Sequence, residues 1–397
     1  MVATTNLHDA NDEIMPGVVA DRRDFHEHPE LGFQEVRTSG IVAERLRSLG
    51  LDDVTTGIAG TGVTGLIHGK KGRGKVVLLR ADMDALPILE ENAVPYVSQN
   101  PGVMHACGHD AHTAILLAVT RLLMERRDEF AGTVKVLFQP AEELPPGGAK
   151  PMIDAGVLEH PHVDAVFGLH MAQDARLGTV EVRSGPYMAA ADRFLITIQG
   201  KGGHGASPHD TVDPIAVGAQ IVTALQTLVS REVKPIESGV VSVCAFIGGD
   251  AFNVIPDRAE LRGTVRTFTP ENRDMLERRI SELVTGIATA MRATATVDFA
   301  RGYPATVNEE AMTQIVRAAA AEVVGPENVI DAEPMMGAED FSYFLQARPG
   351  SYFFIGSRNE DRGLVWGHHH PKFDIDEASM AIGIETMLRT TLGYLAS

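Results

Sequence analysis

Residues 104–112, with the sequence MHACGHDAH, carry side chains that bind metal ions. Three histidines and one cysteine fall within eight residues, directly before a predicted helix. A divalent cation of borderline softness binds imidazole nitrogen, thiolate and carboxylate together, whereas a hydrophobic core has no use for three polar rings in one loop. The segment therefore predicts one part of a metal site, and the rest of the chain must supply further ligands.

Polar side chains also follow four apolar, strand-like runs. These are residues 75–80 before Asp82 and Asp84, residues 133–138 before Glu142 and Glu143, residues 164–169 before His170, and residues 351–356 before the triplet His368, His369 and His370. Open α/β sheets gather their functional groups where strands end and loops begin. We therefore expect the four segments to direct these polar residues toward one edge of a sheet.

The elements around these segments predict an α/β fold with an insertion. Up to residue 186 helix and strand patterns alternate, and the first pattern resumes after Tyr303. Helices are predicted at 34–49, 111–127 and 213–230 and from Pro270, and Gly50 ends the first of them. The middle segment is predicted to contain strands at 194–199, 240–247 and 259–267. Because the C-terminal histidines must return to the first layer, we expect a doubly wound catalytic domain, residues 1–186 and 304–397. A smaller α+β module, residues 187–303, interrupts it, with hinges predicted at Pro186 and Pro304.

A series of motifs then points to a family that the chain resembles. In order, they are HPELGFQE from His28, RADMDALP from Arg80, MHACGHDAH, QPAEE, GLH, GKGGHGASPH from Gly200, FNVIP from Phe252, GAEDF from Gly337 and HHHPKFD. This order, over nearly the whole chain, resembles the M20 family of metallopeptidases and, within it, the amidohydrolase branch that cleaves N-acyl amino acids.

The resemblance implies a site for two divalent metal ions per subunit. Carried over residue by residue, the ligands are Cys107, His109, Glu143, His170 and one C-terminal histidine. The family's marker is a histidine two residues before proline, which selects His369, although His368 and His370 stay open as alternatives. A thiolate ligand suits zinc, cobalt or nickel, while carboxylates and imidazoles admit manganese, so zinc or manganese is expected and nickel or cobalt also fits.

Glu142 is then the expected general base. Neighbouring residues in an extended stretch point to opposite sides, so Glu143 can bind metal while Glu142 faces the substrate. A carboxylate beside an acidified water can take its proton and hand it to the leaving amine.

Other polar residues near the motifs are expected to support the ligands. We assign Asp84 an outer-shell role in the catalytic site. Asp82 stands where the family often has a metal-binding histidine. By resemblance His109 fills that coordination here, so Asp82 is not expected to bind metal directly. His105 and His112 are expected to support the ligands or to be neighbours with satisfied hydrogen bonds, and metal binding is the less favoured alternative for each. His26 and His28 are expected to be structural.

By resemblance, the inserted module forms a homodimer and contributes His204 to the active site of the partner subunit. A donor aimed at charge that appears only in the transition state lowers the barrier, which fits a role in stabilising the oxyanion. The simpler alternative is a histidine in a flexible turn, because glycines surround it. Asn253 is expected to hydrogen-bond the substrate, and Arg266 to hold a substrate carboxylate with its planar fork.

Two apparent nucleotide-binding signatures fail on context. Gly60, Gly62 and Gly65 match GxGxxG, but no helix follows, so we predict a turn. Residues 69–75 match GxxxxGK, yet Val76 stands where a serine or threonine is required and a strand follows. We interpret this second segment as a hairpin-like loop.

Composition sets the outer limits. The chain has 397 residues, of which 44% are hydrophobic and 22% charged, and this composition is typical of a globular protein with two domains. It contains neither a membrane-spanning apolar run nor a signal-peptide pattern. We therefore expect a cytoplasmic protein with no membrane partner. The formal charge of −18 argues against nucleic acid as a partner. Cys107 is assigned to metal, so no disulfide is expected, and Cys244 is interpreted as a small buried hydrophobe.

The expected reaction is hydrolysis of the amide bond of N-acyl amino acids with aliphatic, aroyl or indole-acyl groups, which releases a carboxylic acid and a free amino acid. A dipeptidase or small-peptide carboxypeptidase of the same family is the nearest alternative. An alternative of a different class is a catalytically inactive, metal-dependent binding protein, against which the glutamate pair and His204 count.

Overall fold

A computed structural model describes the chain from residue 5 to residue 397, and it divides into two compact units. Unit 1 contains the chain up to Gly185 together with Val307–Glu333 and Asp340–Ser397. Unit 2 contains Pro186–Thr306 and also the short segment Pro334–Glu339. The chain passes from one unit to the other in β7 (Gly185–Met188) and returns in β14 (Thr306–Asn308). Each unit has its own hydrophobic core.

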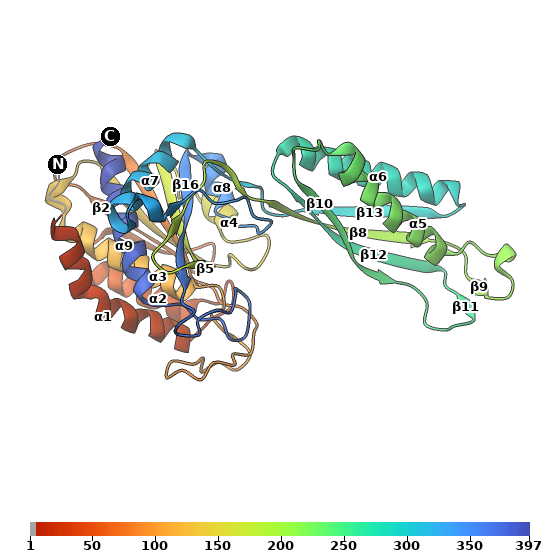
Figure 1. Cartoon of the computed structure of the whole chain (residues 1–397), viewed down its shortest axis with the longest axis horizontal. Helices are drawn as coiled ribbons and strands as arrows, with labels where there is room; N and C mark the ends of the chain where they lie inside the picture. The colour runs from red at the N-terminus through yellow and green to blue at the C-terminus, as the bar shows by residue number, and fades with distance from the viewer. Residues whose placement is uncertain (1–4) are drawn as a thin grey trace. The chain divides into compact units, whose positions relative to one another are not determined.

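Unit 1 is built on an eight-stranded mixed sheet (Figure 1). In spatial order its strands are β1 (Asp52–Ile58), β2 (Gly62–His68), β4 (Thr133–Gln139), β3 (Val76–Asp82), β5 (Ala165–Arg176), β16 (Gly350–Arg358), β6 (Val180–Glu181) and β15 (Val329–Ile330). The four central strands, β4, β3, β5 and β16, are parallel to one another. The strands of all four predicted segments are therefore neighbours that run in the same direction, as expected.

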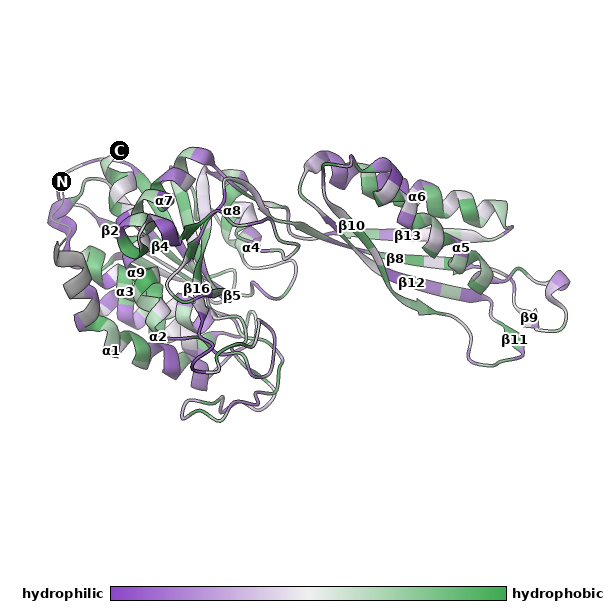
Figure 2. Cartoon of the chain, viewed as in Figure 1, coloured by the Kyte–Doolittle hydropathy of each residue, from purple (hydrophilic) through white to green (hydrophobic). Residues whose placement is uncertain are grey.

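Helices cover both faces of this sheet, which makes it a doubly wound α/β unit. The helices of unit 1 are α1 (Thr5–Glu27), α2 (Val36–Ser48), α3 (His109–Glu125), α4 (Ala149–Asp154), α7 (Glu310–Val324), α8 (Ser342–Ala347) and α9 (Ala378–Ala396). Alternate residues of β3, Val77 and Leu79, pack into the core that α1, α3 and α9 share. Arg80 points to the other face, where it lies over the ring of Phe341 next to α8. Figure 2 shows hydrophobic residues along the strands and on the helix surfaces that cover them.

The two glycine-rich segments have different outcomes. Residues 58–62 form the turn of the antiparallel β1–β2 hairpin, and Gly60 has a φ of +101°, which only glycine adopts without strain. The predicted turn is therefore confirmed. The hairpin-like interpretation of residues 69–75 is wrong, because β4 lies between β2 and β3 in the sheet and pairs with both.

Unit 2 is an antiparallel sheet with two helices, an α+β arrangement. Its strands follow the order β10 (Gly239–Ile247), β12 (Arg258–Thr267), β8 (Ala190–Gln199) and β13 (Thr294–Arg301), and its helices are α5 (Pro214–Thr227) and α6 (Pro270–Ala290). Both helices begin at a proline, and the side chains of Asp213 and Thr269 cap them by accepting backbone N–H groups. A separate ribbon pairs β9 (Gly203–His204) with β11 (Val254–Ile255).

Cys244 corrects one prediction. It is exposed, not buried, and it lies on β10, which is an edge strand of the unit 2 sheet. The pairing with β12 shifts between Val243 and Ala245, so Cys244 lies at a bulge, and alternation from the buried Val241 places its side chain on the opposite, more exposed face of the strand.

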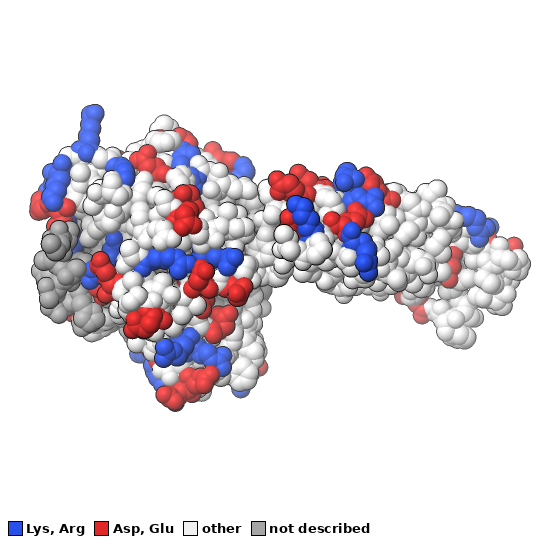
Figure 3. All heavy atoms as spheres, turned by 45° about the horizontal axis from the view of Figure 1, so that its top comes forward, with Lys and Arg blue, Asp and Glu red and all other residues white. Residues whose placement is uncertain are grey.

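Two surface properties bear on partners. On the face of unit 1 drawn in Figure 3, lysine and arginine side chains lie among acidic ones, and neither sign forms a continuous field. None of the helices between residues 5 and 397 combines the length and the hydrophobicity that a bilayer span needs.

Candidate metal centre

Cys107 and His109 are positioned by a tight turn at the start of α3. Gly108 between them has a φ of +92°, and a Cβ atom there would lie 3.2 Å from the Cβ of Met171. Only glycine fits both the conformation and the space. The turn places the Cys107 thiol beside β5 and makes His109 the first residue of α3.

His109 presents one ring nitrogen without a hydrogen-bond partner. Its Nδ1 donates to the carbonyl oxygen of Asp84 at 2.9 Å. Its Nε2 is buried and makes no hydrogen bond with any described residue. A histidine that donates from Nδ1 to a backbone carbonyl offers the Nε2 lone pair to a metal. Asp82 Oδ2 lies 3.7 Å from this nitrogen, beyond hydrogen-bond distance. A buried ring nitrogen without a hydrogen bond fits a metal ligand.

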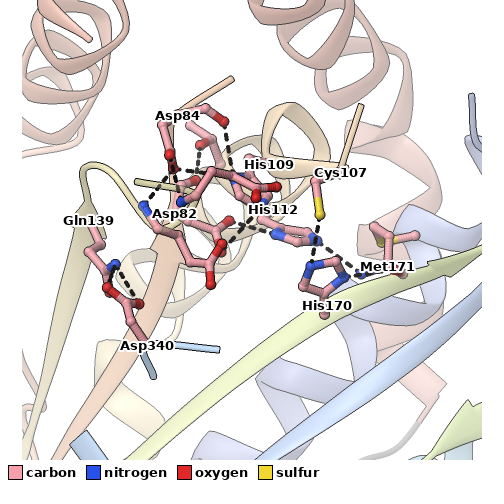
Figure 4. Close-up of polar contacts among 12 residues, drawn as sticks. Asp82, Asp84, Cys107, His109, His112, Gln139, His170, Met171 and Asp340 are labelled. Atoms are coloured by element: carbon pink, nitrogen blue, oxygen red, sulfur yellow. Dashed lines mark hydrogen bonds and ion pairs between the residues drawn. The ribbon is translucent and has the colours of Figure 1, made fainter. Parts of the chain in front are cut away.

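His170 repeats the same arrangement from the opposite side of the site. It donates from Nδ1 to the carbonyl of Met171 at 2.8 Å, and its Nε2 lies 3.5 Å from the Cys107 sulfur (Figure 4). Cys107, His109 and His170 bring their ligand atoms within 4.8 Å of one another. His170 lies inside β5, not beyond its end as predicted, because the strand continues to Arg176.

A second group of ligand atoms shares the same cysteine. Cys107, Glu143 and His369 also lie within 4.8 Å of one another, and His369 Nε2 is 3.0 Å from Glu143 Oε1. The other two histidines of the triplet, His368 and His370, contact other residues. His368 donates to the carbonyl of Met171, and His370 stacks on Trp366 with ring centroids 4.3 Å apart. All five predicted ligands thus lie in two groups that meet at Cys107.

The glutamate pair follows β4, but not in an extended stretch. Residues 140–146 form bends and turns, so simple alternation does not orient Glu142 and Glu143. Asp84 holds both residues by their backbones, because its carboxylate accepts the Glu142 N–H and the Glu143 N–H, each at 2.9 Å. Glu142 is buried at 6% exposure, and its carboxylate lies within 4.8 Å of ligand atoms of His109 and Glu143.

The remaining histidines of the motif differ in their surroundings. His112 uses both ring nitrogens within the protein: Nδ1 donates to Asp82 at 2.6 Å, and Nε2 accepts the Met171 N–H at 2.9 Å. It therefore supports the strand that carries His170. His105 is buried away from the ligand groups, and burial lowers its pKa to about 3.

Sequence reasoning missed a buried arginine behind the site. Arg80 is 2% exposed and donates to Asp82, Gln139 and Asp340 at 2.6 to 2.9 Å. Figure 4 shows the hydrogen bond from Gln139 to Asp340, and it also draws Asp82 and Asp84. An arginine inside the apolar run of residues 75–80 was the available signal, because arginine is almost never fully buried unless it is paired.

The charges of the centre favour a cation. Burial by itself lowers the pKa of His109, but Asp82 and then Asp84 outweigh it and raise that pKa to about 10. Burial by itself raises the pKa of Asp82, but Arg80, His109 and His112 together more than reverse this and hold the pKa well below its usual range. The acids around His109 thus stabilise positive charge at this point.

Two other predicted ligands, Cys107 and His170, are instead kept uncharged by their surroundings. Burial raises the pKa of the Cys107 thiol well above its usual range, and Glu143 and Glu142 raise it further. Burial, together with His112 and His368, lowers the pKa of His170, which keeps this ring neutral. A metal ion would bind the neutral imidazole directly, but the thiol must first lose a proton.

The predicted substrate-binding residues all belong to unit 2. His204 lies on β9 opposite Val254 and accepts the Ala206 N–H at its Nδ1, 3.0 Å away. Asn253 is exposed in the same ribbon, where its carbonyl accepts the Gly205 N–H. Arg266 lies on β12 and donates to Met336 O and Val265 O within unit 2.

Comparison with known proteins identifies the family. The model of peptidase family M20/M25/M40 matches residues 78–392. The chain belongs to the M20 family. A putative amidohydrolase, YhaA of Bacillus subtilis, is 48% identical over 377 residues, which are 95% of this chain and 94% of that protein. An N-acyl-L-amino acid amidohydrolase of Geobacillus stearothermophilus is 48% identical over 297 residues, 75% of this chain and 79% of that protein.

A solved M20 structure extends the likeness to the fold. The YXEP protein of Bacillus subtilis, described as a dinuclear metal-binding peptidase, superimposes with a TM-score of 0.85 at 35% identity and covers 97% of this chain and 99% of that one. The resemblance drawn from the motifs is confirmed, and so is the interpretation as an enzyme. The chain is a metal-dependent amidohydrolase of the M20 family.

Proposed function

We propose that this enzyme hydrolyses the amide bond of N-acyl amino acids to a carboxylic acid and a free amino acid. The observation that carries the proposal is the pair of ligand groups that meet at Cys107, with the Glu142 carboxylate beside them. The Geobacillus relative is named for the same reaction. The acyl group is aliphatic, aroyl or indole-acyl.

Five side chains of unit 1 would hold two divalent ions. The proposed ligands are Cys107, His109, His170, Glu143 and His369. When bound, the ions lower the pKa of water and polarise the amide carbonyl. Zinc or manganese is the proposed metal, and nickel or cobalt fits the same donors.

Glu142 is the proposed general base. It takes one proton from the attacking water as the new C–O bond forms, and it returns that proton to the nitrogen as the C–N bond breaks. The free amino acid therefore leaves as a neutral amine in this step, and no outside acid is needed. Asp84 supports this role because it holds the backbone of Glu142.

Residues 187–303 are proposed as an inserted dimerisation domain, with residues 1–186 and 304–397 as the catalytic domain. We propose that His204 of this domain acts in the active site of the partner subunit. Since Ala206 N–H donates to Nδ1, a neutral His204 carries its hydrogen on Nε2 and can donate it to an oxyanion. Asn253 and Arg266 would hold the amide and the carboxylate of the substrate.

The test is a substrate panel assayed with zinc, manganese, cobalt and nickel. N-acetyl amino acids, hippurate, indole-acetyl amino acids and free dipeptides are compared for kcat/KM, with and without a chelator. We expect metal-dependent cleavage of the N-acyl substrates, and a loss of roughly 100- to 10,000-fold in kcat for Glu142→Gln. Glu44→Gln, on the exposed side of α2, is the control and should be unchanged. Faster cleavage of dipeptides than of every N-acyl substrate would overturn the substrate assignment.

A further inference from the structure

Glu35 is a buried carboxylate that the proposed mechanism does not use. It lies at the start of α2, within the HPELGFQE motif, and its side chain is fully buried. Its Oε2 accepts the hydroxyl of Thr61 at 2.6 Å. Its Oε1 accepts two backbone N–H groups, from Phe33 at 3.0 Å and from Ala141 at 2.8 Å.

Both of these backbone donors are in the left-handed region. Phe33 has a φ of +62° and Ala141 a φ of +53°, and neither is glycine. Such a conformation is costly for residues with a Cβ and persists only where the surroundings hold it. One carboxylate oxygen therefore holds two strained turns, and Ala141 directly precedes Glu142.

The loop that carries Glu35 also packs against the loop that carries the glutamate pair. A Cβ atom on Gly32 would lie 3.0 Å from the Cβ of Ala141, so the two turns are in close contact. The same loop is joined to the end of β3, because Ala85 N–H donates to the carbonyl of Glu30 at 2.8 Å. Three segments that are distant in sequence meet here.

Glu35 and Asp84 together bind three consecutive amides. Ala141 N–H donates to Glu35, while Glu142 N–H and Glu143 N–H donate to Asp84. We propose that Glu35 is a positioning residue, which sets the backbone turn at Ala141 so that Glu142 and Glu143 reach their separate places. The proposal rests on the function proposed above for those two glutamates.

The experiment replaces Glu35 by leucine, which has a similar size and accepts no hydrogen bond. Cobalt binding to the metal-free enzyme is followed by the visible absorption of the ion, and kcat and KM are measured separately. We expect cobalt affinity and kcat each to fall roughly 10- to 100-fold, as for other residues that orient metal ligands, with little change in KM. Glu35→Gln keeps one carbonyl acceptor for Ala141 and should recover most of the loss.

Glu30→Leu is the matched control. Glu30 lies in the same loop and accepts the N–H groups of Arg37 and Thr38 at the start of α2, but no bond joins its side chain to residues 140–143. Glu30→Leu should lower thermal stability and leave cobalt binding unchanged.

Because a buried leucine can prevent folding, Glu35→Asp is measured as well. It keeps the charge but withdraws the carboxylate by one methylene, and the same losses are expected in smaller size.

Ala141→Gly separates positioning from general stability. Glycine adopts a positive φ at no steric cost, so it should recover part of the activity lost in Glu35→Leu if the turn at residue 141 is what Glu35 controls. Equal losses from Glu35→Leu in the alanine and glycine backgrounds would overturn the proposal, and so would wild-type cobalt binding and kcat in folded Glu35→Leu or Glu35→Asp. Wild-type enzyme that binds no cobalt and cleaves no N-acyl substrate would instead refute the proposed function.

Discussion

His26 should make the stability of unit 1 depend on pH. This fully buried histidine of α1 hydrogen-bonds Asp110 at 2.8 Å through Nδ1 and Glu90 at 3.1 Å through Nε2. Burial and the nearby Arg22 lower its pKa, but the two carboxylates outweigh them and raise the pKa to about 8. The protonated ring is therefore the form that the fold stabilises.

The sign and the size of the effect follow from linkage. Because the pKa is raised on folding, the contribution of His26 is complete below the unfolded value of 6.5 and is lost as pH rises through about 8. The difference between 6.5 and about 8 corresponds to about 2 kcal/mol of unfolding free energy. The neighbouring His105 has a folded pKa of about 3, so only the unfolded chain binds a proton at this residue near pH 6.5, and the resulting slope has the opposite sign. This slope is common to wild type and the His26 variant and cancels in their difference.

The assay is urea unfolding of the metal-free protein at pH 6 and pH 9, for wild type and His26→Gln. Trp366 is the only tryptophan and belongs to unit 1, so its fluorescence follows the unfolding of the unit that contains His26. We expect the advantage of wild type over the variant to shrink by about 2 kcal/mol between the two pH values. His28→Gln, at a partly exposed position just beyond α1, is the control. An advantage of the same size at both pH values would refute the reasoning.

Two further predictions concern the metal and the partner subunit. Cys107→Ser should lose bound metal and activity, and when metal is added it should release fewer protons than wild type. The reason is that burial raises the pKa of the Cys107 thiol, so the metal must displace that proton. Calorimetry in two buffers of different ionisation enthalpy measures the proton release, and unchanged release would exclude a thiolate ligand. His204→Ala and Glu142→Gln should each be inactive alone, but mixed subunits should recover about a quarter of wild-type activity, since half of the dimers are mixed and each has one intact site. No recovery after verified subunit exchange would place His204 in its own subunit's site.

Local sequence was sufficient for the types of ligand and the elements that carry them. The helices predicted at 34–49 and 111–127 appear as α2 and α3 within two residues at each end. The choice of His369 came from the resemblance to the family, whose marker is a histidine two residues before proline. The structure places that ring beside Glu143, while His368 and His370 have other contacts. These features depend on hydrophobic periodicity, on helix ends and on residue chemistry, which are all written over a few neighbouring positions.

Tertiary structure decided what each polar side chain does. The order of strands in the sheet separates β2 from β3, and Cys244 is exposed on an edge strand. Which strands are neighbours and which strand lies at an edge do not follow from local periodicity. The places of Arg80 and Glu35 depend on partners that lie more than fifty residues away in the chain, such as Gln139 and Ala141. A buried charge is stable only where such partners converge, and that convergence exists only once the strands and loops have come together.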